Sequence, residues 1–340
     1  MDNIKTIQRN LFKRIIQMRG GSKDFVEELG ALLNLKKSAS NNRIRGATKL
    51  SLTELITIAQ KYRISIDPFI DSKYHPISFT CDAIRKMPTD IDDYLINIAK
   101  HFKQITQAKN INFTYFADEV PIFHFMQFPV LFYFKLFVWN YMSWKIPDYL
   151  DGFSIDQFEK KERLSGIMDQ LSHTYYEYPG IEIWNVRMLD LSLDQLKYFI
   201  ISGAIRDKND AIAIFQAIKD LCQHLEMIAQ RGAKFMPNDQ DNLLGDTSVF
   251  LNEIKKGTDI ILVKSDHFKI VYSTFDSPNF IKTQNNRFIE HTQEVIDKVT
   301  QSSSDISGKG EKDRKNVFMR IRKKVLSAEK EINGLLDFIY

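Results

Sequence analysis

The stretch that decides the fold runs from Gly21 to Asp67 and reads GSKDFVEELGALLNLKKSASNNRIRGATKLSLTELITIAQKYRISID. Its apolar residues recur at helical spacing in two segments, and a short polar segment separates them. We expect Ser22 to cap the first helix, and Ser51 with Glu54 to begin the third as a capping box. The predicted buried faces are Phe25, Val26, Leu29, Leu32 and Leu33 on the first helix, and Leu52, Leu55, Ile56, Ala59 and Tyr62 on the third.

The polar segment between them, at about 38–45, is predicted to be a short helix that ends at Gly46, because glycine enters the left-handed region without strain. Its inward positions are few, namely Ala39 or Ser40, and Ile44. The other side chains suit a DNA major groove, since Asn pairs with adenine, Arg with guanine and Lys with phosphate. A solvated surface helix has the same composition, so the segment alone leaves both interpretations open.

Positive charge is concentrated around this stretch. Residues 1–70 contain 13 Lys and Arg against 6 Asp and Glu, a net charge of +7. The whole chain carries +4, so residues 71–340 carry a net charge of −3. A basic segment of this kind is expected when the partner is a polyanion such as DNA.

The segment EELGALLNLKKSASNNRIRGATKLSLTELITIAQKYRISID resembles the helix–turn–helix of the lambda-repressor-like (Xre-type) transcriptional regulators. The resemblance covers about 50 of the 340 residues. It is carried by Leu29-Gly30, by Gly46 after the polar helix, by Ser51-Leu52 and by the exit Ile64-Ser65-Ile66-Asp67. It implies a bacterial-type, cytoplasmic regulator that binds double-stranded DNA by sequence and does no chemistry.

If the segment binds DNA, two sets of contacts are expected from it. The residues expected to read bases are Lys37, Ser38, Asn41, Asn42 and Arg45. The residues expected to hold phosphates are Lys23, Lys36, Arg43 and Lys49. A further amphipathic helix before the motif is predicted from Ile4, Ile7, Leu11, Ile15 and Met18.

Residues 1–70 are therefore predicted to form an all-α DNA-binding domain, which ends near Pro68 because proline disfavours helix in the preceding residue. Residues 71–340 are predicted to form a larger α-rich domain for regulation or dimerisation. Helical periodicity dominates there, and 155–235 is interpreted as helical throughout. Alternating segments near 258–285 predict a small antiparallel β-hairpin or sheet. The expected fold class is mainly α.

Residues 111–150 hold 14 of the 41 aromatic residues of the chain. A membrane span is excluded, because the apolar runs on either side of Lys135 are far shorter than the roughly 20 residues that a bilayer needs. Two interpretations remain open. The stretch forms a helix in the core of the larger domain, or it lines a pocket for a small-molecule effector.

The last segment, 311–340, is predicted to be one long helix. Its apolar residues form a heptad seam of Phe318, Ile321, Val325, Ala328, Ile332, Leu335 and Ile339. Lys324 and Glu329 stand at positions that pair between parallel helices. The seam either forms a homodimer contact through Phe318, Ile321, Val325, Ile332 and Leu335, or packs against its own domain.

No catalytic or cofactor motif is found. The seven histidines show no HExxH pairing, GxSxG and GxGxxG are absent, and Cys81 and Cys222 are too far apart for a metal or redox motif. We therefore expect no enzyme activity, no cofactor and no metal. Two alternatives to the regulator stay open: a protein-interaction module on a helical scaffold, and a DNA-targeted enzyme with an unrecognised site in residues 71–340.

Overall fold

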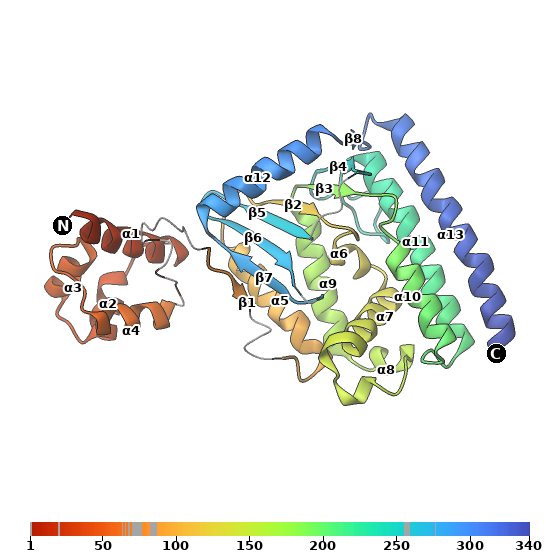
Figure 1. Ribbon diagram of the computed structural model, residues 1–340, viewed down its shortest axis with the longest axis horizontal. Coiled ribbons are helices and arrows are strands. Elements are labelled where there is room, and N and C mark those ends of the chain that lie inside the picture. Colours follow the sequence, from red (N-terminus) through yellow and green to blue (C-terminus); the bar gives the residue numbers. More distant parts are fainter. Residues whose placement is uncertain are drawn as a thin grey trace.

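The computed structural model describes residues 2–19, 21–62, 64, 66, 69, 77–81, 87–254, 259–275 and 277–340. Within these residues the helices and strands form an N-terminal helical unit and a larger domain, each with its own hydrophobic core (Figure 1). Helix predominates, as the sequence predicts. The predicted boundary between residues 70 and 71 lies outside the described residues.

The N-terminal unit contains α1 (Asp2–Met18), α2 (Phe25–Leu33), α3 (Lys37–Ile44) and α4 (Leu52–Tyr62). Its core joins Phe12 of α1 to Phe25 of α2 and Ile58 of α4, all of them buried. The capping box at the start of α4 is confirmed. The backbone N–H of Glu54 donates to Ser51 Oγ at 3.1 Å, and the N–H of Ser51 donates to Glu54 Oε2 at 2.7 Å.

Two local predictions for this unit are wrong. The first is the cap of α2, which begins at Phe25 after Asp24, a residue in the left-handed region at φ 59°. Ser22 therefore does not cap it. The second is the buried face of α4: Leu52 is 72% exposed and Ile56 is 47% exposed, whereas Ile58 is fully buried. Since residues two apart point to nearly opposite sides of a helix, burying Ile58 against the unit turns Ile56 outward.

The larger domain is built on a mixed sheet, eight-stranded within the described residues, in the order β1-β7-β6-β5-β2-β3-β4-β8. β2 pairs in parallel with β3, and β3 pairs in parallel with β4. The other pairs are antiparallel. The strands are β1 (Thr80–Cys81), β2 (Asn112–Phe116), β3 (Gly180–Trp184), β4 (Thr247–Leu251), β5 (Ile260–Lys264), β6 (Lys269–Thr274), β7 (Phe280–Thr283) and β8 (Ser304–Asp305).

The predicted hairpin is present as β5 and β6, with β7 as a third antiparallel strand; Thr258, its predicted first residue, lies outside the described residues. The prediction of a small antiparallel sheet is wrong, because the hairpin lies inside the mixed sheet, with β7 beside β6 and β2 beside β5. The helical interpretation of 155–235 is also wrong at β3. Central parallel strands are buried on both faces, so they lack the apolar–polar alternation that marks a half-buried strand.

Helices cover both faces of the sheet. α12 (Asn286–Gln301) packs on one face against a small cluster that includes Phe116, Leu262 and Val271. The main core lies on the other face (Figure 1). The helical segments that complete the domain are α5 (Ile91–Ile105), α6 (Ile122–Phe125), α7 (Pro129–Trp139), the π-helical η2 (Asn140–Trp144), the 3-10 turn η3 (Pro147–Tyr149), α8 (Ile155–Glu159), α9 (Glu162–Glu177), α10 (Asp190–Ile201), α11 (Lys208–Arg231) and α13 (Glu311–Ile339).

The aromatic stretch forms α7, in which every residue from Leu131 to Trp139 is buried. The interpretation as a core helix is confirmed. The described part of the chain contains no helix with both the length and the apolar character that crossing a membrane requires.

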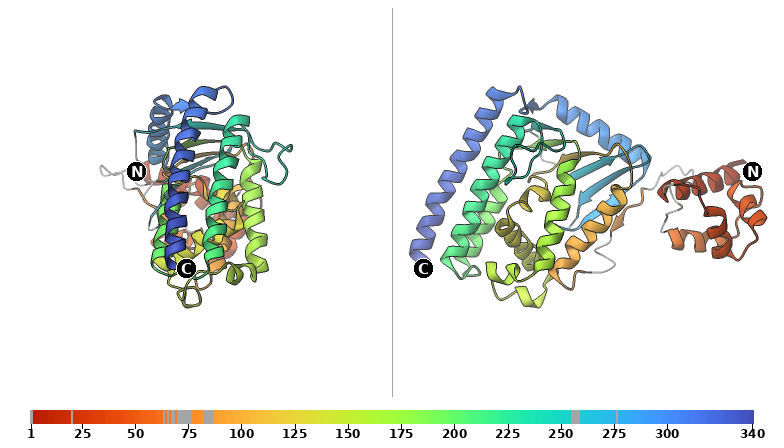
Figure 2. Two further views of the ribbon diagram at one scale, coloured as in Figure 1. Left: turned by 90° about the vertical axis from the view of Figure 1, so that its right-hand side faces the viewer. Right: turned by 180° about the vertical axis from the view of Figure 1, so that it is seen from behind.

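The heptad seam of α13 packs against α10 and α11 of its own chain, along the side of the larger domain away from the N-terminal unit (Figure 2). Most of its residues are buried: Phe318, Ile321, Val325, Ala328 and Ile332. Lys324 Nζ lies 2.6 Å from Asp190 Oδ2, and Lys219 Nζ lies 2.9 Å from Glu329 Oε1. The homodimer contact predicted through Phe318, Ile321, Val325, Ile332 and Leu335 is thus not available on this surface, because intrachain packing fills it; Leu335 alone among the five is only partly buried.

Candidate nucleic-acid interface and ligand cavity

The residues predicted to read bases lie together on α3 and at its C-terminal end. Lys37, Ser38, Asn42 and Arg45 are exposed, and Asn41 is half-buried. Their spacing places them on one face of the helix. Only Ser40 of α3 is fully buried, and its hydroxyl donates to the carbonyl of Lys36 at 3.4 Å. The face is therefore polar, contiguous and open to solvent, apart from an exposed ion pair between Lys37 and Glu27 at 3.1 Å.

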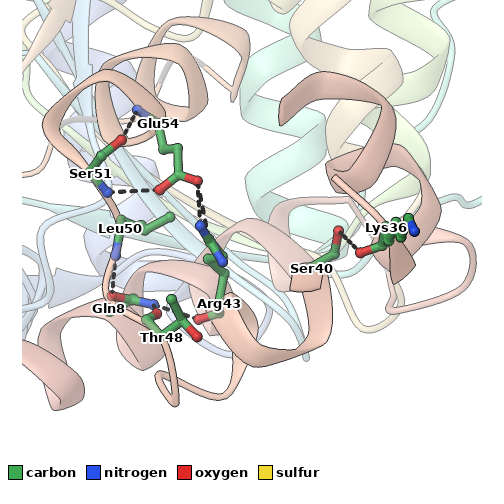
Figure 3. A network of polar contacts seen from close by, with 8 residues as sticks. All are labelled: Gln8, Lys36, Ser40, Arg43, Thr48, Leu50, Ser51 and Glu54. Carbon is green, nitrogen blue, oxygen red and sulfur yellow. Dashed lines mark hydrogen bonds and ion pairs between the residues drawn. The ribbon is translucent and has the colours of Figure 1, made fainter. Parts of the chain in front are cut away.

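The predicted phosphate contacts divide into two kinds. Lys23, Lys36 and Lys49 are exposed, before α2, before α3 and in the α3–α4 loop. Arg43 is different, because its guanidinium lies against Glu54 with Nε 3.1 Å and Nη2 3.0 Å from Oε1 (Figure 3). The side chains of this pair are 19% and 16% exposed. Arg43 therefore has an intramolecular role that the sequence did not indicate.

Gln8 of α1 holds the C-terminal end of α3 and the loop that follows it through side-chain hydrogen bonds to their backbone. Its Nε2 donates to the carbonyls of Arg43 at 2.6 Å and Thr48 at 2.9 Å, and its Oε1 accepts from the N–H of Leu50 at 3.0 Å (Figure 3). Gln8 is 5% exposed, so these hydrogen bonds replace water at groups that would otherwise be buried without partners. No local pattern predicts this role of Gln8, because its partners lie 35 to 42 positions away along the chain.

Glycine is required where α3 ends. Gly46 has φ 69°, in the left-handed region, and a Cβ there would lie 2.9 Å from Lys5 Cγ on α1. The predicted role of Gly46 as the residue that closes the polar helix agrees with this geometry. Together with Gln8, it holds the α3–α4 connection close against α1.

The larger domain contains a partly open cavity of about 110 Å³ between α5, the α6–α7 region and strands β2, β5, β6 and β7. Its wall is mainly aromatic and aliphatic, and residues of the aromatic stretch such as Phe125 and Trp139 contribute to it. Two carboxylates, Glu119 and Asp259, and the ammonium of Lys135 also face it. The stretch from 111 to 150 thus supplies both a core helix and part of a cavity wall.

The charged groups of the cavity differ in how they are paired. Lys135 Nζ lies 2.6 Å from Glu119 Oε1 and donates to Gln195 Oε1 at 3.2 Å. Asp259 accepts hydrogen bonds from the N–H of Asp118 at 3.1 Å and from Thr274 Oγ1 at 3.3 Å. In the part of the chain that the structure describes, no cation forms an ion pair with Asp259. Burial raises the pKa of the Asp259 carboxyl, and the Asp118 hydrogen bond opposes this.

A second polar cluster lies in the core beside β3. Glu182 accepts from Tyr175 Oη and from Trp184 Nε1, both at 2.9 Å, and His124 Nε2 lies 2.9 Å from its Oε2. Lys234 is fully buried, with Nζ 4.6 Å from the centre of the Tyr175 ring. Burial lowers the pKa of Lys234 to about 8. None of these side chains lines the cavity, so the cluster is a buried network rather than an accessible site.

This buried polar network was not predicted from the sequence. A buried carboxylate in a short strand has no periodic signature, and its partners come from α6 and α9 as well as from β3. The described residues contain no group of three or more His, Cys, Asp or Glu side chains placed to hold a metal ion. Comparison with protein families, with characterised proteins and with solved structures finds no match to this chain.

Proposed function

We propose that this chain is a cytosolic, sequence-specific DNA-binding transcriptional regulator that places α3 in the major groove. The observation that carries the proposal is the exposed polar face of α3, on a segment whose net charge is +7 and which resembles the lambda-repressor-like regulators. In this proposal Lys37, Ser38, Asn41, Asn42 and Arg45 contact base edges. No match to a known protein contributes to it.

The surroundings of α3 support the proposal. Gln8 and the Arg43–Glu54 ion pair fix the helix before DNA arrives, so binding loses little conformational entropy. Lys23, Lys36 and Lys49 carry the phosphate contacts. Arg43 is assigned to positioning α3, since its guanidinium is already paired.

We further propose that the larger domain makes DNA binding responsive to a small molecule held in the cavity. β1, the first strand after the N-terminal unit, pairs with β7, and Phe280 of β7 lines the cavity. The side chain of Arg14 on α1 also donates to Gln284, just after β7. A ligand that moves β7 would thereby act on the strand that follows the N-terminal unit and on the Arg14–Gln284 contact.

One observation favours a second function, a protein-interaction module. Leu52 and Ile56 lie one helical turn apart on α4, and both are exposed. Exposed apolar pairs of this kind occur at protein–protein contacts. This alternative predicts that the chain does not bind DNA and that Leu52→Ser with Ile56→Ser releases a co-purifying protein.

The test is fluorescence anisotropy of the full chain with a random-sequence duplex at several salt concentrations. We expect affinity to fall steeply with salt, and Lys49→Ala to reduce the slope of log K against log salt by about 1. Lys103→Ala, an exposed lysine of α5, is the matched control and should leave the slope unchanged. Absence of binding at low salt by the folded chain would exclude the DNA-binding function.

A further inference from the structure

The cavity of the larger domain has an excess of negative charge in its wall. Its lining includes two carboxylates and one lysine ammonium. The ammonium of Lys135 is paired with Glu119 at 2.6 Å, which leaves Asp259 as the carboxylate with no ion-pair partner among the described residues. His101, which also lines the cavity, has Nδ1 3.0 Å from Lys282 Nζ; Lys282 is not part of the lining.

Aromatic rings surround this charge. Tyr94 and Trp139 are in edge contact with centroids 5.6 Å apart, and Tyr272 and Phe280 are in edge contact at 5.5 Å. All four line the cavity. Aromatic faces attract cations through the ring quadrupole, most strongly where water is excluded. A carboxylate among such rings is a suitable environment for an ammonium group.

The chain already uses this combination once in the same wall. The ammonium of Lys135 is held by the Glu119 carboxylate and lies 5.0 Å from the centre of the Phe125 ring. The side chain of Lys135 is 1% exposed, so the local environment stabilises a fully buried ammonium through one carboxylate, one ring and the amide oxygen of Gln195. Asp259, with the nearby Tyr115 ring, offers a second carboxylate and ring, and no described residue places a cation on them.

The carboxylate of Asp259 interacts electrostatically with the side chain of Tyr115. Burial raises the pKa of Tyr115 well above its usual value, and the Asp259 carboxylate adds to this effect. Tyr115 in β2 also pairs with Ile261 in β5, two residues after Asp259. The two side chains therefore face the same part of the cavity.

The volume sets the size of the occupant. The cavity of about 110 Å³ is smaller than the roughly 150 Å³ cavity that holds benzene in another protein, so about four or five non-hydrogen atoms fit. We propose that the cavity binds a small organic cation, with its ammonium group on Asp259 and its short apolar body among the rings. This inference names the ligand class for the ligand-responsive part of the proposed function, and it is tested by binding without DNA.

The experiment is isothermal titration calorimetry of the full chain with three probes of similar shape: isobutylammonium chloride, isobutanol and sodium isobutyrate, at one pH and ionic strength. We expect isobutylammonium to bind about tenfold or more tightly than isobutanol, because a hydrogen bond to a charged partner contributes more than a neutral one. Isobutyrate should not bind. This comparison needs no variant.

Two variants then locate the site. Asp259→Asn should weaken isobutylammonium binding about tenfold and leave isobutanol binding unchanged. Asp118→Asn is the matched control, since Asp118 is an exposed neighbour whose side chain does not line the cavity. It should leave the binding of all three probes unchanged.

Equal affinity for the three probes, tighter binding of isobutyrate, or no binding of any probe would each overturn the inference. So would an Asp259→Asn chain that binds isobutylammonium as the original does. A chain that binds the cation but no DNA would overturn the proposed function and keep the ligand class. A chain that binds DNA but not the cation would overturn the ligand class and keep the DNA-binding function.

Discussion

Arg43 of α3 and Glu54 of α4 form an ion pair in which Nε and Nη2 of the guanidinium lie 3.1 and 3.0 Å from one carboxylate oxygen (Figure 3). The other oxygen of Glu54 accepts from the N–H of Ser51 at 2.7 Å and so starts α4. One carboxylate therefore joins the last turn of the polar helix to the first turn of the next. The orientation of α3 depends on α4 through this contact.

Glu54→Gln should loosen the N-terminal unit in a pH-dependent way. Burial alone would raise the pKa of Glu54, but hydrogen bonds from Ser51 and Arg43 outweigh it and lower the pKa below 4.5. A lowered pKa gives stability that is present above pH 4.5 and is lost as the pH falls through the folded-state value. At pH 7 we expect a loss of about 1 kcal/mol in the opening free energy of α3 and α4, measured by amide hydrogen exchange.

As the pH falls below 4.5 the difference between Glu54→Gln and the original chain should shrink, because Glu54 becomes protonated as the pH passes through its lowered folded-state pKa. Glu27→Gln is the matched control, because Glu27 forms an exposed pair with Lys37. Equal exchange in Glu54→Gln and the original at pH 7 would show that the ion pair does not hold α3.

Gln8→Ala should destabilise the N-terminal unit by about 2 kcal/mol. The change removes a buried amide and leaves the Arg43 and Thr48 carbonyls and the Leu50 N–H without this partner. Gln17→Ala on the exposed side of the same helix is the control and should change stability by less than about 0.5 kcal/mol. Hydrogen exchange of α1 to α4 measures both, and equal effects would refute the role of Gln8.

Arg45→Ala should change which sequences the chain prefers. Arg45 is exposed just after α3, and an arginine that reads guanine contributes about 1–3 kcal/mol of discrimination at one base pair. Selection of bound duplexes from a random pool should show one position relaxed relative to the original chain. A uniform loss of affinity on every sequence would instead assign Arg45 to a phosphate.

Lys234→Met should stabilise the larger domain at neutral pH. The pKa of Lys234 is lowered to about 8 by burial, against 10.5 in an unfolded chain, so the folded state disfavours the proton. The charge therefore costs about 3 kcal/mol at pH 7, and the penalty fades as the pH rises between these two values.

The stabilisation by Lys234→Met should fall to about 1 kcal/mol at pH 10, where the folded chain holds Lys234 neutral. Denaturant unfolding at the two pH values measures it. Lys100→Met, at an exposed position of α5, is the control and should show no such pH dependence. A loss of stability at pH 7 would mean that the attraction between Lys234 and Glu182 outweighs the burial of the charge.

Local patterns in the sequence predicted much of the secondary structure. Ser51 and Glu54 mark the start of α4 because a capping box needs only four consecutive residues. The polar helix, the β5–β6 hairpin and the long α13 also follow from short-range periodicity. Such features depend on neighbours in the chain, so a single sequence contains them.

Long-range contacts could not be predicted in this way. Glu182 looks like an ordinary polar residue in GIEIW, and only the fold brings it to His124 and Tyr175. Lys135 likewise suggested an interruption of an apolar run, whereas it is a buried ammonium with its own carboxylate. The cavity was expected only as a property of 111–150, since Asp259 lies more than a hundred residues further along the chain.

The two cores also differ in when they can form. The core of the N-terminal unit uses residues between 11 and 69, so it is complete once a short length of chain has been synthesised. The sheet instead pairs Thr80 with Lys282, and β2 cannot form its pairing with β5 until β5 has been synthesised. During translation the basic unit would fold first and remain attached to a nascent chain, with β1 unpaired until most of the protein has left the ribosome. A chain truncated before β5 would thus keep a folded N-terminal unit on an unfolded remainder.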